Sequence, residues 1–186
     1  MNASSPVLID LPAELGPDGY AVVCSPARLR AVAALLDAGD AMAAQLSEVA
    51  RQITAAFGVR AAAVNLVLAG SVAVVASHGM PASVLEAGGL PGEWGPCTDV
   101  VDTNAAVLID DLGERYPGGR NAVMTVNGIR AYAGVPLRLQ DQVVGALCVF
   151  DDRTRAVTAE MVAVLAVISD DIMEMLLRAA SGDVLR

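Results

Sequence analysis

At 186 residues, the chain has the length of one domain with a sizeable hydrophobic core. Its residues are 55% hydrophobic but only 3% aromatic, so the core must be built from aliphatic side chains. A net charge of −9 argues against nucleic acid as a direct partner, because an acidic protein repels phosphate backbones. All basic residues are arginine, which excludes a P-loop lysine, a Schiff-base lysine and a pyridoxal-phosphate site.

The sequence carries no sign of secretion or of membrane insertion. Residues 1–19 lack the basic and apolar regions of a signal peptide, and no stretch reaches the roughly 18 apolar residues of a membrane span. Three cysteines, Cys24, Cys97 and Cys148, are odd in number and far apart, which argues against a disulfide framework. We therefore expect a cytoplasmic protein without a membrane partner.

The N-terminal third predicts an irregular start followed by two helices. Residues 1–26 are rich in proline and glycine and are expected to form an extended lead-in. An amphipathic pattern over residues 27–38 predicts a short helix that Gly39 ends. Asp40 can cap a second helix, whose apolar side chains repeat every three or four residues as far as Phe57.

The next part of the chain predicts a β-hairpin and then a loop. Two apolar runs, residues 61–69 and 71–77, are separated by Gly70. Asn65 is the one polar side chain of the first run, which makes it a candidate to face a pocket. Glycines and prolines over residues 78–94 predict a loop with one helical turn near its middle.

Short elements follow between two long loops. Thr98 and Asp99 suit the first turn of a short helix that begins at Cys97. Residues 105–109 predict a third strand that ends at a pair of aspartates, and residues 113–128 predict a second long loop.

A hairpin over residues 128–152 is expected to form the middle of the sheet. Its second strand, residues 143–150, is almost entirely apolar, as in a strand covered on both faces. In its first strand Arg130 and Tyr132 fall on one face. That face must offer the guanidinium water, a partner carboxylate or a ligand.

The last predicted helix, residues 158–178, carries more apolar surface than one sheet can cover. Met161, Leu165, Ile168, Ile172 and Met175 repeat at helical spacing, and further valines, leucines and a methionine broaden the stripe. We therefore expect the helix to be buried on two sides, against its own sheet and against a second copy of the chain in a homodimer.

The order of these elements resembles the GAF domain, a PAS-like α/β sensor fold. The hairpin is the most specific part of the resemblance. The segments that carry it are Leu46–Ile53 with Phe57–Val59, Ser77–Pro81, Cys97–Asp102, Val107–Leu112, and Gly128–Leu137 with Val144–Asp151.

The resemblance covers roughly residues 28–178, and we set the domain at 27–180, before a tail of residues 181–186. It implies an α/β (α+β) fold in which an antiparallel sheet carries the terminal helices on one face and a loop-covered pocket on the other. Dimers through the terminal helices are common in the family. The fold hosts many ligands, so the resemblance does not name one.

The expected pocket wall combines the polar residues of the hairpins with those of the loops. The candidate ligand-binding residues are Asn65, Trp94, Cys97, Thr98, Asp99, Asp111, Arg130 and Tyr132. Trp94 either plugs the core or covers a cavity. The paired aspartates are typical of turns and exposed helix faces, so neither a metal nor a cofactor is expected.

The cysteines leave two interpretations open. At a helix N-terminus Cys97 would have a lowered thiol pKa, and otherwise it is a small buried apolar side chain. Cys148 lies in a core strand and is expected to be inert, whereas Cys24 is expected to be exposed.

Three functions follow from these observations. The first is a stand-alone sensor domain for a small polar or anionic ligand, with a possible signalling partner protein. The second is a thiol-dependent enzyme or redox sensor of the free methionine sulfoxide reductase type, in which Cys97 would be catalytic. The third is a dimerising adaptor without a working pocket.

Overall fold

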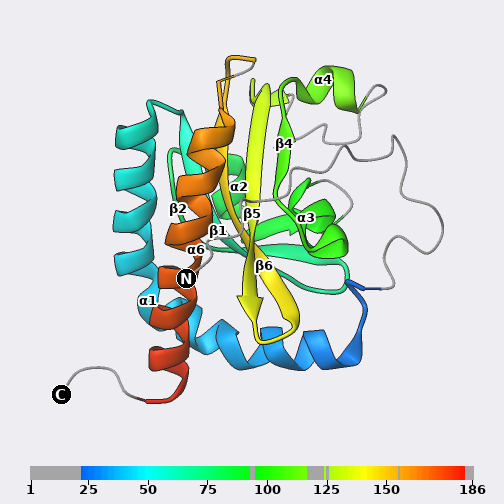
Figure 1. The fold of residues 1–186 in the computed structure, drawn as a ribbon, viewed down its shortest axis with the longest axis vertical. Helices are drawn as coiled ribbons and strands as arrows, with labels where there is room; N and C mark the ends of the chain where they lie inside the picture. Colours follow the sequence, from blue (N-terminus) through cyan, green and yellow to red (C-terminus); the bar gives the residue numbers. More distant parts are fainter. Residues whose placement is uncertain (1–21, 93–94, 117–123, 125, 155, 183–186) are drawn as a thin grey trace.

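The computed structural model describes residues 22–92, 95–116, 124, 126–154 and 156–182, in which one antiparallel sheet carries helices on both faces (Figure 1). This is the α/β (α+β) arrangement expected from the sequence. The helices are α1 (Pro26–Phe57), α2 (Ala82–Glu86), α3 (Cys97–Thr103), α4 (Leu112–Arg115) and α6 (Ala159–Ala180). The strands are β1 (Ala61–Val67), β2 (Ser71–His78), β3 (Gly89–Pro91), β4 (Val107–Ile109), β5 (Ala131–Leu139) and β6 (Gln142–Asp151).

The sheet has six strands in the order β3-β2-β1-β6-β5-β4. The predicted central hairpin is confirmed, because β5 and β6 pair through the turn at Gln140 and Asp141, and β6 is also paired with β1. The register shifts at two places, between Val64 and Asn65 on β1 and between Leu137 and Arg138 on β5. The second shift decides which side chains of the hairpin share a face.

Alternate residues of the central strands divide the core into two layers. One face of the sheet packs against α1 and α6, and the other packs against α3 (Figure 1). The face towards α1 and α6 is aliphatic and includes Val64, Leu66, Val135, Leu147 and Val149. The face towards α3 includes Ala63, Tyr132, Ala146, Cys148 and Phe150, and it carries the polar groups of the candidate site.

The prediction of two N-terminal helices is wrong, since α1 is continuous from Pro26 to Phe57. The helix bends between its first part and its second part, which run in clearly different directions (Figure 1). Gly39 does not end the helix but lies against β2, where an added Cβ would come within 2.8 Å of Val75 Cγ1. The glycine therefore permits close helix–sheet packing.

Two short elements lie where the sequence predicts only loop. Strand β3 extends the sheet by pairing with β2, and Gly89 at its start approaches the Val72 carbonyl at a positive φ of 154°. Helix α4 is capped by Asp111, whose side chain accepts a hydrogen bond from the Gly113 backbone amide. Such short elements depend on local backbone hydrogen bonds and leave little hydrophobic periodicity to detect.

Arg28 is fully buried at the start of α1, a feature that the sequence analysis missed. Its guanidinium donates to the carbonyl oxygens of Val23 and Val67 at 2.9 and 2.7 Å. The nearby carboxyl group of Asp102, on α3, provides an opposite charge. Arg28 thus ties the segment before α1 to the sheet.

None of the helices in the described part of the chain is long and apolar enough to cross a membrane.

Candidate functional site

Two buried thiols meet in the layer between α3 and the sheet. Cys97, the first residue of α3, and Cys148, in the middle of β6, place their Sγ atoms 3.3 Å apart. Cys97 is 3% exposed and Cys148 is 0% exposed, and neither forms a disulfide. From the sequence, Cys97 is the one candidate for thiol chemistry and Cys148 is expected to be inert, so the pair itself is not predicted.

Small neighbours on both adjacent strands leave room for this contact. Cys148 lies opposite Ala63 on β1 and opposite Gly134 on β5. A Cβ on Gly134 would come within 2.1 Å of Tyr132 Oη. The Tyr132 ring can therefore lie across Gly134 and reach the thiols, because that position has no side chain.

A tyrosine and an asparagine complete the cluster, which we call the thiol cluster (Asn65, Cys97, Tyr132 and Cys148). Tyr132 Oη lies 3.2 Å from Cys148 Sγ and 3.6 Å from Cys97 Sγ. Asn65 Nδ2 donates towards Cys97 Sγ at 3.4 Å and towards Cys148 Sγ at 3.8 Å. Asn65 Oδ1 is buried and has no hydrogen-bond partner in the described part of the chain. An unpaired acceptor of this kind costs stability and therefore calls for an explanation.

The surroundings shift the pKa values of the two thiols in opposite directions. Hydrogen bonding from Cys148 lowers the pKa of Cys97, and Tyr132 and Asn65 add to this effect against the opposing influence of burial. Burial raises the pKa of Cys148 well above its usual value. Burial likewise raises the pKa of Tyr132, so its hydroxyl keeps its proton. The thiolate therefore forms at Cys97 first, because hydrogen bonding outweighs burial at Cys97 whereas burial dominates at Cys148.

Two further predicted residues lie on α3 beside the thiol cluster, but their side chains form hydrogen bonds with groups outside it. Thr98 Oγ1 donates to the Gly92 carbonyl at 2.6 Å and fixes the segment before α3. Asp99 accepts a hydrogen bond from Tyr116 Oη at 2.6 Å. Both side chains are buried, so they hold α3 over the cluster.

The structure does not bring the side chains of Arg130 and Tyr132 together, although the sequence places them on one face of the strand. Tyr132 is fully buried in the cluster, whereas the Arg130 side chain is 48% exposed and forms an ion pair with Asp111. The reason is that β5 begins only at Ala131, so Arg130 lies at the end of the sheet, where α4 presents its capping aspartate. Of the eight candidates, Trp94 lies outside the described residues.

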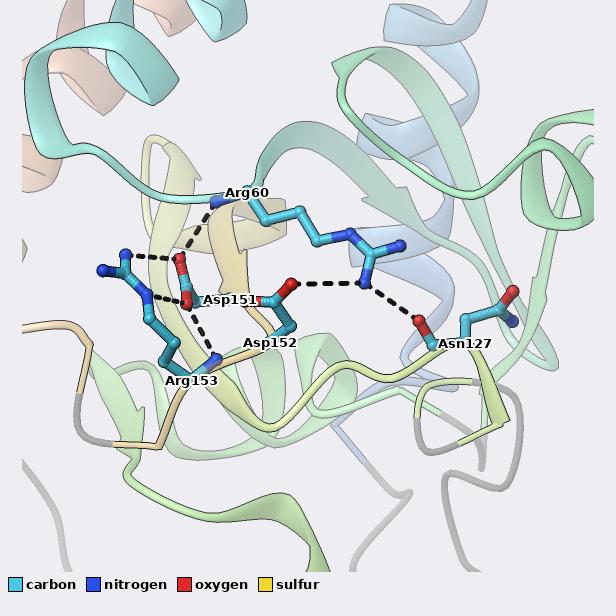
Figure 2. Close-up of polar contacts among 5 residues, drawn as sticks. All are labelled: Arg60, Asn127, Asp151, Asp152 and Arg153. Carbon is cyan, nitrogen blue, oxygen red and sulfur yellow. Dashed lines mark hydrogen bonds and ion pairs between the residues drawn. The ribbon is translucent and has the colours of Figure 1, made fainter.

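A second buried polar group lies at the end of β6, around Asp151 (Figure 2). The Asp151 carboxylate accepts hydrogen bonds from the backbone amides of Arg60 and Arg153 and from the Arg153 guanidinium. Burial opposes ionisation, but the bonds from Arg153 and Arg60 outweigh it and lower the pKa of Asp151. Figure 2 shows Arg60 reaching the Asn127 carbonyl and Asp152.

Comparison with known proteins assigns the fold to a family. The GAF domain family profile matches residues 42–176, most of the chain. The chain belongs to the GAF domain family. No curated protein sequence matched it.

Several solved structures resemble this GAF domain in fold. One is a type II free methionine-R-sulfoxide reductase from Thermoplasma acidophilum, with a TM-score of 0.62 and 16% identity over 75% of this chain and 94% of that one. Another is the GAF domain of an Acinetobacter phosphoenolpyruvate-protein phosphotransferase, with a TM-score of 0.62 and 15% identity over 86% and 99%. A third is a domain of a two-component sensor histidine kinase protein described as putative, from Sinorhizobium meliloti, with a TM-score of 0.62 and 16% identity over 77% and 96%.

The side of this GAF domain that carries α1 and α6 also has a recess. A groove of about 410 Å³ lies between α1 and α6. Its lining residues are Val49, Gln52, Ile53, Ala56, Phe57, Val164, Ile168, Asp171, Ile172 and Met175. The domain thus offers a polar cluster on one side of the sheet and an apolar groove on the other.

Proposed function

We propose that this chain is a regulatory GAF domain that receives a small polar signal on the α3 side of the sheet. In this proposal the signal leaves through α1 and α6, which pair with a second copy of the chain or contact a signalling partner protein. Free thiols, one of them the exposed Cys24, favour a reducing compartment such as the cytoplasm.

The buried, unpaired Oδ1 of Asn65 is the observation that carries the sensor role. A strand buried on both faces gains nothing from an amide whose acceptor is unsatisfied, and a leucine would fill the position without this cost. The arrangement is useful if a molecule with an O–H or N–H donor reaches Asn65 during the working cycle.

A panel of small polar metabolites tests this role by thermal unfolding. A ligand at a hundred times its dissociation constant should add about 2.7 kcal/mol of stability. The shift should be reduced in Asn65→Leu and kept in Asp152→Asn, which changes an exposed side chain at the end of the sheet. A panel in which no compound stabilises the protein contradicts a ligand-binding role.

The groove and its rim support the homodimer. Val164, in the groove, is 47% exposed, and Val167 is 64% exposed on the same helix. Exposed apolar side chains beside an apolar groove are typical of an interface. By contrast, Ile172 and Leu176 are fully buried, so aspartate at either position would unfold the domain and reveal nothing about association.

Light scattering at tens of micromolar tests the dimer. The wild type should have the mass of two chains, and Val164→Asp should have the mass of one while remaining folded. Val126→Asp is the matched control, because Val126 is 85% exposed and does not line the groove. A wild-type monomer contradicts the homodimer and leaves a different partner protein for this surface.

A second candidate is a thiol-dependent enzyme that reduces a small sulfoxide. The 3.3 Å separation of the two Sγ atoms favours it, because such a reaction needs an attacking thiol and a resolving thiol. Thioredoxin-coupled turnover of free methionine sulfoxide that Cys97→Ser abolishes would support it. Absence of turnover would reject it and leave the sensor.

A further inference from the structure

The sensor proposal alone does not explain why two thiols lie together beneath α3. We propose that Cys97 and Cys148 form a reversible dithiol–disulfide couple that a small hydroperoxide oxidises, with Cys97 attacking and Cys148 resolving. This deepens the sensor role by naming its stimulus. Its signalling meaning rests on that role, whereas the thiol chemistry can be tested without it.

The two sulfur atoms need only a small movement to bond. They lie 3.3 Å apart, and a disulfide requires about 2.05 Å, so the gap must close by roughly 1.3 Å. Strand β6 is held on both sides by β1 and β5 and cannot move independently. The displacement therefore falls to α3, a seven-residue helix that carries Cys97 at its start.

The cluster also distinguishes the attacking thiol from the resolving thiol. Cys97 Sγ can accept hydrogen bonds from the Cys148 thiol, from Tyr132 and from Asn65, whose Nδ2 lies nearer to it (3.4 Å) than to Cys148 Sγ (3.8 Å). They stabilise negative charge on that sulfur and lower the pKa of Cys97, whereas burial keeps Cys148 protonated. Since the thiolate is the nucleophile, Cys97 reacts first.

Burial and the polar neighbours select the oxidant. With both cysteines at most 3% exposed, reagents reach them through local opening of the fold, and a small molecule does so more readily than a bulky disulfide. Asn65 Oδ1 can accept a hydrogen bond from the O–H group of a hydroperoxide beside Cys97 Sγ. Hydrogen peroxide, close to water in size, fits these conditions.

The reaction proceeds in two balanced steps. The Cys97 thiolate attacks one peroxide oxygen, an S–O bond forms, the O–O bond breaks, and the departing hydroxide takes up a proton to leave as water. The Cys148 sulfur then attacks the Cys97 sulfenic acid, the S–S bond forms, the S–O bond breaks, and the Cys148 proton leaves with the oxygen as water. Two thiols lose two electrons, and the peroxide becomes two waters.

The test uses the full chain with Cys24→Ser, which removes the exposed thiol and leaves the thiol cluster intact. The protein is treated with hydrogen peroxide, alkylated after unfolding, and analysed by intact mass and peptide mapping. We expect the loss of two hydrogen atoms, no alkylation, a crosslink between the Cys97 and Cys148 peptides, and full recovery with dithiothreitol. Glutathione disulfide should react at least about tenfold more slowly.

Two further variants assign the roles. With Cys148→Ala, dimedone should trap a sulfenic acid at Cys97, and with Cys97→Ala, Cys148 should react at least about tenfold more slowly than Cys97 does. Two alkylatable thiols after peroxide treatment, or equal reactivity in both variants, would overturn the proposal. The Cys24→Ser protein carries no substitution in the core. Failure to form the disulfide in this protein therefore cannot be attributed to misfolding of a core variant. If the disulfide forms but α1, α6 and the proposed dimer stay unchanged, the sensor role is rejected and the thiol chemistry stands.

Discussion

Asp151 and Cys148 lie on the same strand and are both buried, but their polar surroundings differ. Each oxygen of Asp151 accepts hydrogen bonds from backbone amides or from the Arg153 guanidinium, which favour its charged form. Around Cys148 the donors are weak, the sulfur atoms interact with each other, and Asn65 keeps an unpaired acceptor. A buried polar group whose hydrogen bonds are all formed stabilises one structure. A buried group that lacks some of its hydrogen bonds lowers stability, and a role in chemistry or binding can explain why it is kept.

The largest expected effect comes from breaking the satisfied group. Asp151→Asn should lower the free energy of unfolding by about 2–3 kcal/mol at neutral pH, because charge-assisted hydrogen bonds at a buried site are lost. Asp152→Asn is the control and should change little, since Asp152 is exposed and 3.9 Å from Arg60.

The same group has a definite pH dependence. Because folding lowers the pKa of Asp151, its contribution is fully present above the unfolded value of about 3.9 and is lost as the pH falls through the folded pKa. Denaturant unfolding of the wild type and Asp151→Asn should therefore converge in acid. A constant difference down to the lowest pH at which both fold would contradict this account.

The next effect comes from removing the space that Tyr132 occupies. Gly134→Ala should cost about 1–3 kcal/mol, because the new methyl group overlaps Tyr132 Oη and Cζ in a closed core. It should also slow peroxide oxidation by displacing the hydroxyl from the thiols. Gly70→Ala is the matched control, with no atom within 4 Å of its added Cβ. Similar unfolding curves for the two variants would contradict the packing described for Tyr132.

A change of opposite sign is expected at Asn65. Asn65→Leu should raise the free energy of unfolding by up to about 1 kcal/mol, because it removes an unpaired buried acceptor and keeps a similar volume. It should at the same time lower the rate of disulfide formation. A destabilisation as large as that of Asp151→Asn would show that Asn65 is structural.

The smallest effect concerns Asp102, on α3 near Arg28. Burial, with help from the Asp99 charge, raises the pKa of Asp102 to about 6. Neither carboxylate oxygen has a regular hydrogen-bond partner in the described part of the chain, although the Val23 amide acts in the opposite direction on the pKa. The folded state therefore holds a proton that the unfolded state releases, and stability falls as the pH rises from about 3.9 to about 6.

Asp102→Asn removes this titration. The variant should gain less than about 1 kcal/mol over the wild type near pH 8, because the group is partly exposed, and should gain nothing near pH 4. Chemical unfolding at both pH values measures the difference. Identical profiles for the two proteins would show that Asp102 is already satisfied.

Much of the fold could be predicted from the sequence because hydrophobic periodicity reports the elements directly. The strands around Gly70, the central hairpin and the helix after Thr158 all lie where their patterns place them. At Gly39 the pattern was misleading, because a glycine can serve a close helix–sheet contact as well as a helix end.

The thiol cluster could not be predicted because its assembly depends on one register shift. Continuing the pairing of Leu139 with Gln142 without a shift would place Cys148 opposite Ala133, on the face towards α1 and α6. The irregularity at Leu137 and Arg138 instead places it opposite Gly134, on the face of Tyr132. A shift of one residue turns every side chain to the other face, and the sequence does not reveal the bulge.

A redox titration of the Cys24→Ser protein tests the central claim most directly. The protein is equilibrated with mixtures of reduced and oxidised dithiothreitol, quenched, and analysed for free Cys97 and Cys148 by mass spectrometry. A two-electron couple predicts that both thiols disappear together along one transition that is identical in the oxidising and reducing directions. Two thiols that stay free throughout, or that are lost independently of each other, would contradict it.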